Sequence, residues 1–350
     1  MASVAIIIGL SLLGVLIVGS VGAWVWLFYY VKHKLYPYLP RIFEEKPLFI
    51  IPRGQPIEDA EEVRFQSHDG LELVGCYFPS FTELRKGVIL FGLEFGSNRW
   101  ACVPYCEFLR EAGFDVFTFE PRCQGDSETD ETYEPLQWVT SWDIQDMQSA
   151  VTYLRSRDDS DPGGIGFFGI SKGGSAGLAV AANDPYIRCF VTDGIFATYT
   201  TMVPYMRRWI QIYSHSSRRL LQRILPNWYY GMFAKMGLRE VARKRNVEFP
   251  SLERALPKLG SRPWLMIHGE ADSYIKVEMA EALFKLAPGP KELWLVEGAK
   301  HNQSFQIAPE EYRRRILAFF STHLVGSSDL RSTDEVTDST RNIGTPVTAE

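Results

Sequence analysis

A serine between glycines has the sequence setting of a nucleophile. Gly169-Ile170-Ser171-Lys172-Gly173 follows the apolar run Ile165–Phe168 and precedes the small residues Gly174–Ala179. A sharp strand-to-helix turn lifts a serine hydroxyl clear of a sheet, and small neighbours let that turn form without clashes. The N-terminus of the following helix adds partial positive charge where an anion would develop. The motif indicates a serine poised for attack, and the alternative is a glycine-rich turn with a merely exposed serine.

A serine hydroxyl needs a base to remove its proton and a carboxylate to orient that base. The sequence supplies both kinds of side chain, each after an apolar run typical of a strand. They occur in Ile267-His268-Gly269-Glu270-Ala271-Asp272 and in Glu297-Gly298-Ala299-Lys300-His301-Asn302. The chain therefore carries the residue types for acyl transfer through a serine, in the order serine, acid, histidine.

Eight short runs of apolar, β-branched or aromatic residues predict the strands that position these groups. They are Val63–Gln66, Leu71–Phe78, Val88–Phe91, Val116–Phe119, Ile165–Phe168, Cys189–Thr192, Trp264–Ile267 and Leu293–Val296. The first two are joined by Ser67-His68-Asp69-Gly70, whose closing Asp-Gly predicts an antiparallel hairpin.

Helical patterns separate most of the later strands. They cover Pro104–Glu111, Trp138–Arg155, Lys172–Asn183, Val277–Lys285 and Pro309–His323. Strand–helix alternation after a hairpin predicts an α/β fold with a mostly parallel eight-stranded sheet and helices on both faces. In such sheets the chemistry gathers at the carboxyl ends of the strands.

The nucleophile turn, the H-G-x-x-D motif and the G-x-x-H motif, in this order and after these strands, resemble the α/β-hydrolase superfamily. The resemblance covers nearly all of residues 58–324. It implies that Ser171 is the nucleophile, Asp272 the orienting acid and His301 the general base. It also implies a reaction that requires neither a metal nor an organic cofactor.

Two of these roles have rivals in the sequence. His268 is the other candidate base, although it closes a predicted strand and is more typical of a structural hydrogen-bonding residue. Asp193 and Glu270 compete with Asp272, because the order serine, acid, histidine constrains the position of the acid only loosely.

An oxyanion on the reacting carbonyl needs two N–H donors. The resemblance implies the backbone amide of Lys172 and one from the loop after the third strand, with Leu93 as first choice and Glu94 as the alternative. Many relatives have His-Gly where this chain has Phe91-Gly92, so this sequence departs from the family pattern in the loop that would supply the second donor. Because a carboxylate would oppose the oxyanion's charge, we expect Glu94 to point away or to pair with Arg99.

The first segment predicts a membrane anchor. Residues 4–31 carry no charge, whereas about 20 apolar helical residues span a bilayer core. Aromatic residues cluster at the end of this segment and cations follow it: Trp24, Trp26, Tyr29, Tyr30, Lys32, Lys34 and Arg41. The positive-inside bias places the N-terminus outside and the rest of the chain in the cytoplasm. The alternative is a signal peptide cleaved near Val21-Gly22-Ala23, followed by export.

An insertion at about residues 198–258 lies between the sixth and seventh strands and predicts a helical cap over the nucleophile. Up to Arg245 it carries ten cations against Glu240 alone: Arg207, Arg208, Arg218, Arg219, Arg223, Lys235, Arg239, Arg243, Lys244 and Arg245. Anionic headgroups attract such a patch. Its aromatic residues would enter the membrane interface or line an acyl pocket: Trp209, Tyr213, Trp228, Tyr229, Tyr230 and Phe233. The alternative is solvated cations above a local aromatic core.

The composition narrows the remaining classes. With 350 residues, 46% hydrophobic residues and a net charge of −5, the chain is globular and has no chain-wide basic field for nucleic acid. Five sparse cysteines predict neither a disulfide framework nor a zinc site. The predicted divisions are an anchor (1–31), a connector (32–57), the α/β-hydrolase domain (58–324) and a disordered polar tail (325–350), which has little apolar surface.

Together these features predict a membrane-anchored serine hydrolase that cleaves a carboxylic ester, thioester or amide, with lipid-like acyl groups favoured by the anchor and cap. A serine peptidase of the same fold is one alternative, since a fold does not choose the substrate. A non-catalytic, membrane-tethered binding or scaffold protein is the other. The complete Ser171, Asp272 and His301 series argues against a scaffold, and the Phe91 departure argues slightly for it.

Overall fold

Eight strands form a single sheet in the structure, a computed structural model that describes residues 2–34, 36–44, 51–213 and 225–325. The strands are β1 (Glu61–Gln66), β2 (Glu72–Phe78), β3 (Gly87–Gly92), β4 (Phe114–Glu120), β5 (Ile165–Ile170), β6 (Ile187–Asp193), β7 (Trp264–Gly269) and β8 (Lys291–Val296). Each of the eight predicted runs is a strand, extended by up to two residues at either end or shortened by one.

The sheet is mostly parallel, as the alternation of strands and helices predicts. Its strand order is β1-β2-β4-β3-β5-β6-β7-β8. Strand β2 pairs antiparallel with both β1 and β4, and every other pair is parallel. The predicted hairpin is present, with Gln66 opposite Glu72 beside the turn. The carboxyl ends of β3, β5, β6, β7 and β8 therefore meet along one edge of the sheet.

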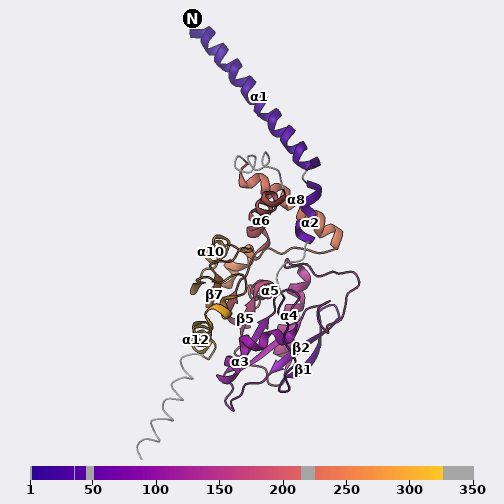
Figure 1. Ribbon diagram of the computed structural model, residues 1–350, viewed down its shortest axis with the longest axis vertical. Coiled ribbons are helices and arrows are strands. Elements are labelled where there is room, and N and C mark those ends of the chain that lie inside the picture. Colours follow the sequence, from indigo (N-terminus) through magenta and orange to yellow (C-terminus); the bar gives the residue numbers. More distant parts are fainter. Residues whose placement is uncertain (1, 35, 45–50, 214–224, 326–350) are drawn as a thin grey trace, which may run out of the picture. The chain divides into compact units, whose positions relative to one another are not determined.

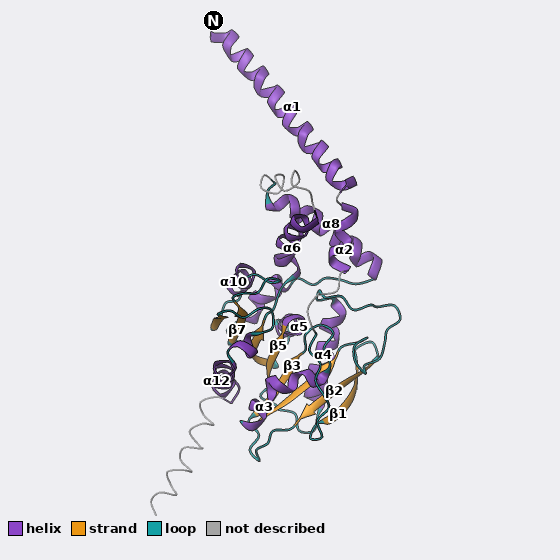
Figure 2. Ribbon diagram, in the orientation of Figure 1, coloured by secondary structure: helices purple, strands orange, loops and turns teal. Residues whose placement is uncertain are grey.

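Helices cover both faces of this sheet (Figure 2). They are α3 (Val103–Glu111), α4 (Ser141–Ser156), α5 (Ser171–Ala181), α9 (Leu252–Ala255), α10 (Val277–Leu286), α11 (Ser304–Ile307) and α12 (Pro309–Phe320), with 3-10 turns at Arg99–Cys102 and Leu256–Leu259 and a π turn at Ser321–Val325. Successive side chains of a strand point to opposite faces. Phe167 accordingly packs in the core beneath α4, α5 and α10, whereas Phe168 packs in the core beneath α3 and α12.

Helix α4 begins later than the sequence pattern predicts. The prediction started it at Trp138, whereas the helix begins at Ser141. The Asp143 carboxylate accepts hydrogen bonds from the backbone N–H of Thr140 at 2.8 Å and from its hydroxyl at 2.9 Å. Thr140 is thus the N-cap of the helix and keeps an extended backbone. The helix cannot begin earlier, because the N–H and hydroxyl of Thr140 are already bound to Asp143. Residues 136–139 are thereby left outside the helix.

The chain divides into two compact units. One comprises Lys46–Tyr205 with Arg245–Glu350 and contains the sheet; the other comprises Met1–Glu45 with Met206–Lys244. These units group residues that the sequence-based boundaries kept apart, since the anchor and part of the predicted cap share one unit. The insertion itself folds as α6 (Thr198–Tyr213), α8 (Asn227–Arg245) and α9. The cations Arg218, Arg219 and Arg223, and the predicted tail at 326–350, lie outside the described residues.

The unit without the sheet begins with α1 (Ala2–Lys34), drawn in indigo in Figure 1. A 3-10 turn (Tyr36–Tyr38) and the short helix α2 (Leu39–Glu44) follow it. One helix of the described chain is long and apolar enough to cross a membrane, with a mean hydropathy of 2.5 over its most apolar window, and it is this N-terminal helix.

Helix α8 packs on the C-terminal end of α1 and on the segment after it. The ring of Trp228 lies 5.7 Å from that of Trp24, and the ring of Phe233 lies 5.4 Å from that of Phe28. The side chains of Tyr229, Tyr230 and Phe233 are buried, whereas that of Trp228 is 63% exposed. Most of the described aromatic residues of α8 therefore form a local core with α1 and the segment after it.

The cap of α4 gives a test of the fold. We expect Thr140→Ala to lower the free energy of unfolding by about 1–2 kcal/mol, because the substitution removes the hydroxyl bonds to Asp143 and Tyr133. Thr152→Ala, at an exposed position of the same helix, should change it by less than about 0.5 kcal/mol. Urea unfolding followed by tryptophan fluorescence measures both, and equal effects of the two substitutions would contradict the cap.

Candidate active site

Ser171 stands in a strained turn between β5 and α5. Its φ is +50°, a value that costs free energy for any residue with a side chain, and its side chain is almost buried. Only glycine fits at two neighbouring positions. A Cβ on Gly173 would lie 2.2 Å from the carbonyl oxygen of Leu93, and one on Gly177 would lie 1.9 Å from the ring of Phe167. The tight packing of α5 on the sheet and on the loop after β3 thus holds the turn.

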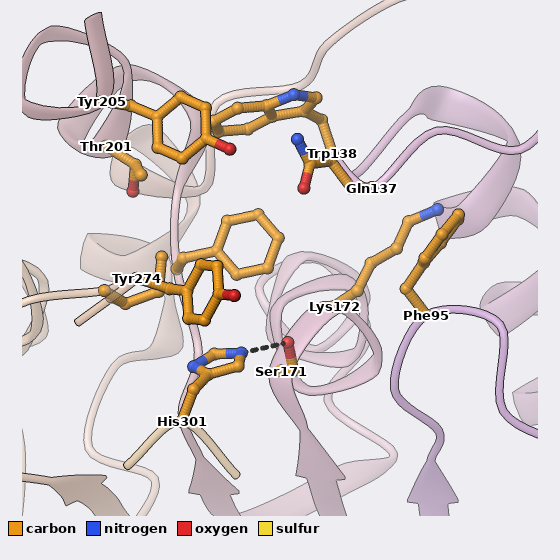
Figure 3. A pocket seen from close by; sticks show the side chains of 11 residues that line it. Phe95, Gln137, Trp138, Ser171, Lys172, Thr201, Tyr205, Tyr274 and His301 are labelled. Carbon is orange, nitrogen blue, oxygen red and sulfur yellow. Dashed lines mark hydrogen bonds between the residues drawn. The ribbon is translucent and has the colours of Figure 1, made fainter. Parts of the chain in front are cut away.

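The structure brings Ser171, His301 and Asp272 together at the carboxyl ends of β5, β7 and β8. The Ser171 hydroxyl oxygen lies 3.1 Å from Nε2 of His301, and Nδ1 of His301 lies 2.6 Å from Oδ2 of Asp272 (Figure 3 shows the first contact). The other Asp272 oxygen accepts backbone N–H bonds from Tyr274 at 2.7 Å and Ile275 at 2.9 Å. An ionised Asp272 makes Nδ1 the donor, so Nε2 is free to accept the serine proton.

The rival residues bind other groups. His268 is fully buried, its Nε2 lies 2.8 Å from the carbonyl oxygen of Ile275, and burial lowers its pKa, so it stays neutral. Asp193 accepts hydrogen bonds from Ser304 at 2.9 Å and Tyr312 at 3.2 Å. Glu270 is exposed. The geometry therefore favours Asp272 over both competing acids as the residue that orients His301. The role of His268 is structural, since its ring binds the backbone of Ile275.

The loop after β3 holds a buried carboxyl group whose partner the sequence did not predict. We expected Glu94 to point away or to pair with Arg99. Instead, the side-chain amide of Asn302, the residue after His301, donates to Glu94 Oε2 at 2.6 Å. Arg99 binds the buried Glu120 at 2.8 Å and Asp126 at 2.7 Å, because a buried carboxylate requires a cation.

Burial changes the charge that Glu94 carries. Its pKa is raised to about 7 by desolvation, against the opposing effects of the Asn302 amide and the charge of His301. A carboxyl group with this pKa is about half neutral near pH 7, which weakens the repulsion of a nearby oxyanion. The group next to the predicted oxyanion donors is thus a titrating acid rather than a permanent negative charge.

The two predicted oxyanion residues lie on segments in close contact. Lys172 is the second residue of α5, and Leu93 belongs to the loop that packs against Gly173. The side chain of Lys172 turns toward another partner: its ammonium contacts Asp143 at 2.7 Å, donates to the carbonyl oxygen of Leu136 at 2.7 Å, and lies 5.2 Å from the Phe95 ring. Lys172 therefore joins the start of α5 to the segment before α4.

A pocket of about 480 Å³, counting its open mouth, surrounds Ser171 and His301 (Figure 3). It is lined by Phe95, Gln137, Trp138, Ser171, Lys172, Phe196, Thr201, Tyr205, Tyr274, Ile275 and His301. Aromatic rings dominate the lining, and pockets with apolar walls and few polar groups are typical of small-molecule sites. The predicted cap insertion contains the wall residues Thr201 and Tyr205, and the predicted helical pattern included Trp138, although α4 begins three residues after it. No sequence pattern marked Gln137 or Phe196 as part of the wall.

No family model matches the chain. Among curated proteins, the uncharacterized protein YfhR of Escherichia coli K12 is 28% identical over 271 residues, which cover 76% of this chain and 82% of YfhR. The quorum-quenching protein AidA of Acinetobacter baumannii is 32% identical over 151 residues, covering 41% of this chain and 47% of AidA. The thiohydrolase aneE of Aspergillus aculeatus is 30% identical over 133 residues, covering 37% of this chain and 40% of aneE.

Solved structures show the fold. The Pyrococcus furiosus esterase Pf2001 superposes with a TM-score of 0.59 at 20% identity, covering 81% of this chain and 98% of the esterase. The α/β hydrolase GrgF of Penicillium superposes with a TM-score of 0.55 at 20% identity, covering 76% of this chain and 99% of GrgF. The chain therefore has the α/β-hydrolase fold, which confirms that part of the resemblance read from the sequence.

The buried carboxyl of Glu94 makes stability depend on pH. The pKa of Glu94 is about 7 in the folded chain and near 4.5 when the group is exposed. Ionisation therefore lowers the free energy of unfolding as pH rises between these values, and this decrease is complete above about pH 8. We expect Glu94→Gln, which has no charge to desolvate, to stabilise the chain by up to about 3 kcal/mol at pH 8.5 and by almost nothing at pH 4.

Urea midpoints at the two pH values measure this difference. Glu270→Gln is the matched control, since it removes an exposed carboxylate near the same edge of the sheet. A Glu94→Gln effect that is the same at both pH values would contradict the assigned titration.

Proposed function

We propose that this protein is a membrane-anchored serine hydrolase that cleaves a carboxylic ester, or a thioester or amide, through an acyl-enzyme on Ser171. The observation that carries the proposal is the continuous chain of contacts from the Ser171 hydroxyl through His301 to Asp272, at 3.1 and 2.6 Å. These side chains come from three separate segments, and Ser171 and His301 line one pocket while the buried Asp272 contacts His301. A scaffold protein has no need of this convergence.

The proposed reaction has two halves. In the first, Nε2 of His301 takes the Ser171 proton while the serine oxygen attacks the carbonyl carbon. The oxyanion that forms is bound by the backbone N–H groups of Lys172 and Leu93, with Glu94 as the alternative to Leu93. Collapse breaks the bond to the leaving group, which departs with the proton from His301. In the second half, His301 takes a proton from water, the hydroxide attacks the acyl-enzyme, and the acid leaves as Ser171 regains its proton.

The fixed parts of the site suit this sequence of steps. Asp272 is held by two backbone N–H groups and faces His301 with its other oxygen, so the imidazolium that forms on proton transfer meets a prepositioned negative charge. Burial of Ser171 and Asp272 limits competing water. The partial neutrality of Glu94 near pH 7 reduces opposition to the oxyanion.

The pocket favours an acyl group with apolar parts. Five aromatic side chains line it, namely Phe95, Trp138, Phe196, Tyr205 and Tyr274. Acyl chemistry also appears in the names of two similar proteins. One is a thiohydrolase, 30% identical over 37% of this chain, and the other is an acyltransferase, 24% identical over 69% of this chain. We therefore place esters and thioesters with lipid-like acyl groups first among substrates, and peptides after them.

The proposed anchor is α1. Its apolar stretch ends in exposed tryptophans at 24 and 26 and is followed by Lys32 and Lys34, the order expected where a helix leaves the bilayer on the cytoplasmic side. Helix α8 packs on the C-terminal end of α1. Its cations and its exposed Trp228 would therefore lie near the headgroup layer at that end of the anchor. In this proposal the active site lies in the cytoplasm, and the protein stays attached to the membrane through α1.

Covalent labelling tests the nucleophile. A fluorophosphonate probe should label the full-length chain in membranes, and Ser171→Ala should abolish the label because no other activated hydroxyl is proposed. His301→Ala and Asp272→Asn should slow labelling by about 10³-fold or more, since they remove the base or misorient it. Ser156→Ala, at an exposed position of α4, is the matched control and should label like the native chain. Absence of labelling in a folded native chain would favour the scaffold alternative.

Extraction and accessibility test the anchor. We expect the chain to stay in the membrane pellet after alkaline carbonate treatment. A cysteine placed at Ser3 should react with an impermeant maleimide from outside the cell, and one placed at exposed Glu83 should react only after permeabilisation. A mature chain that begins after Ala23 and appears outside the membrane would instead establish a cleaved signal peptide and contradict the anchor.

A further inference from the structure

Two polar side-chain atoms in the wall of the pocket lack a hydrogen-bond partner among the residues that the structure describes. They are the amide nitrogen of Gln137 and the hydroxyl of Thr201, and both are buried at the atomic level. Thr201 is only 1% exposed as a residue. Both residues line the pocket that contains Ser171 and His301. In the view of Figure 3 they stand at the opposite end of the pocket from these two side chains.

Such atoms need an explanation, because a buried donor that makes no hydrogen bond lowers stability relative to an apolar group of the same shape. A leucine in place of Gln137 and a valine in place of Thr201 would fill similar space without that loss. Polar atoms of this kind are accounted for when a ligand supplies the missing partner, since they then distinguish that ligand from an apolar analogue.

The backbone around Gln137 is fixed independently of any ligand. The carbonyl oxygen of Leu136 accepts the hydrogen bond from Lys172, which Asp143 holds from the other side. The ring of Trp138 packs edge-on against Phe196 and Tyr205, with centroids 5.9 and 5.8 Å apart. The residues on both sides of Gln137 are therefore held, so that its amide is prepositioned in the wall of the pocket.

The backbone around Thr201 is fixed as well. Its N–H donates to the carbonyl oxygen of Ala197 at 3.0 Å, within the first turn of α6. The preceding residue, Thr200, donates to Glu253 from its N–H at 2.7 Å and from its hydroxyl at 2.9 Å. The start of α6 is thereby attached to α9, so the backbone that carries Thr201 in the pocket wall is held in place.

We propose that Gln137 and Thr201 form a polar subsite that binds an oxygen atom on the acyl chain of the substrate. The Gln137 nitrogen only donates, and the Thr201 hydroxyl both donates and accepts, so the pair suits a carbonyl or hydroxyl oxygen. The aromatic walls receive the methylene groups between that oxygen and the scissile carbonyl. The substrate class is thus an ester or thioester of an oxo- or hydroxyacyl chain, which rests on the proposed hydrolase function and narrows it.

Paired substrates test the subsite. The full-length chain in detergent is assayed with 4-nitrophenyl octanoate and with its 5-oxo, 6-oxo and 7-oxo analogues. We expect kcat/KM for at least one oxo ester to exceed that for the plain ester by about 10-fold, the effect of one added hydrogen bond in a buried site. Gln137→Leu and Thr201→Val should each reduce this ratio toward 1, chiefly by lowering kcat/KM for the oxo ester.

A second variant keeps the shape of the side chain. Gln137→Glu has nearly the same size but, when ionised at pH 8, presents only acceptors to the oxo group, so the ratio should fall to 1 or below. The matched controls are Gln148→Leu and Thr152→Val on the exposed side of α4, which should keep the native ratio.

The outcomes separate this inference from the function on which it rests. A native chain that is labelled by fluorophosphonate and hydrolyses all four esters at equal kcat/KM overturns the subsite alone. A preference for an oxo ester that persists in Gln137→Leu, Gln137→Glu and Thr201→Val also overturns it. A folded native chain that is neither labelled nor active on any ester overturns the proposed function and the subsite together.

Discussion

The positive φ of Ser171 is the constraint on which the rest of the site depends. A strand that passes directly into a helix through one left-handed residue places that residue's side chain above the sheet, but the conformation is unfavourable in isolation. Packing supplies the compensation. Glycines at 173 and 177 let α5 approach the loop after β3 and the ring of Phe167 more closely than any side chain permits. The Ser171 side chain therefore lies in the wall of the pocket, while the residues of its helix are buried against the sheet and the loop after β3.

Lys172, the residue after Ser171, extends this constraint to the pocket wall. The backbone of Lys172 lies at the start of α5, while its ammonium holds Leu136 and Asp143 in a segment far away in the sequence. Asp143 in turn caps α4 through Thr140. A buried ammonium requires such partners, because leaving it unpaired would cost several kcal/mol. One ion pair thus fixes both the turn that carries the nucleophile and the wall that carries Gln137 and Trp138.

The N-terminal helix α1 and part of the insertion are joined by a different kind of interaction. Tilted aromatic ring pairs connect α8 to α1, and the Tyr36 hydroxyl donates to Glu240 at 2.7 Å while Lys244 pairs with Glu44 at 2.9 Å. Polar contacts of this kind suit the wet side of a membrane boundary, and tryptophan rings suit the boundary itself. With α1 as the proposed anchor, α8 would be held at a defined depth, which a flexible connector would not achieve.

Features set by local pattern were predictable from the sequence, and features set by long-range contacts were not. The strands follow from their apolar runs, and Ser171, Asp272 and His301 were placed at strand ends because glycine-bounded motifs mark those ends. The later start of α4 depends on an Asp143 side chain that the apolar pattern does not register. The pairing of Glu94 with Asn302 joins loops 208 positions apart, and no periodicity encodes it. Gln137 and Thr201 are harder still, since what distinguishes them is a buried polar atom with no hydrogen-bond partner among the described residues, and only the packed structure shows which polar atoms these are.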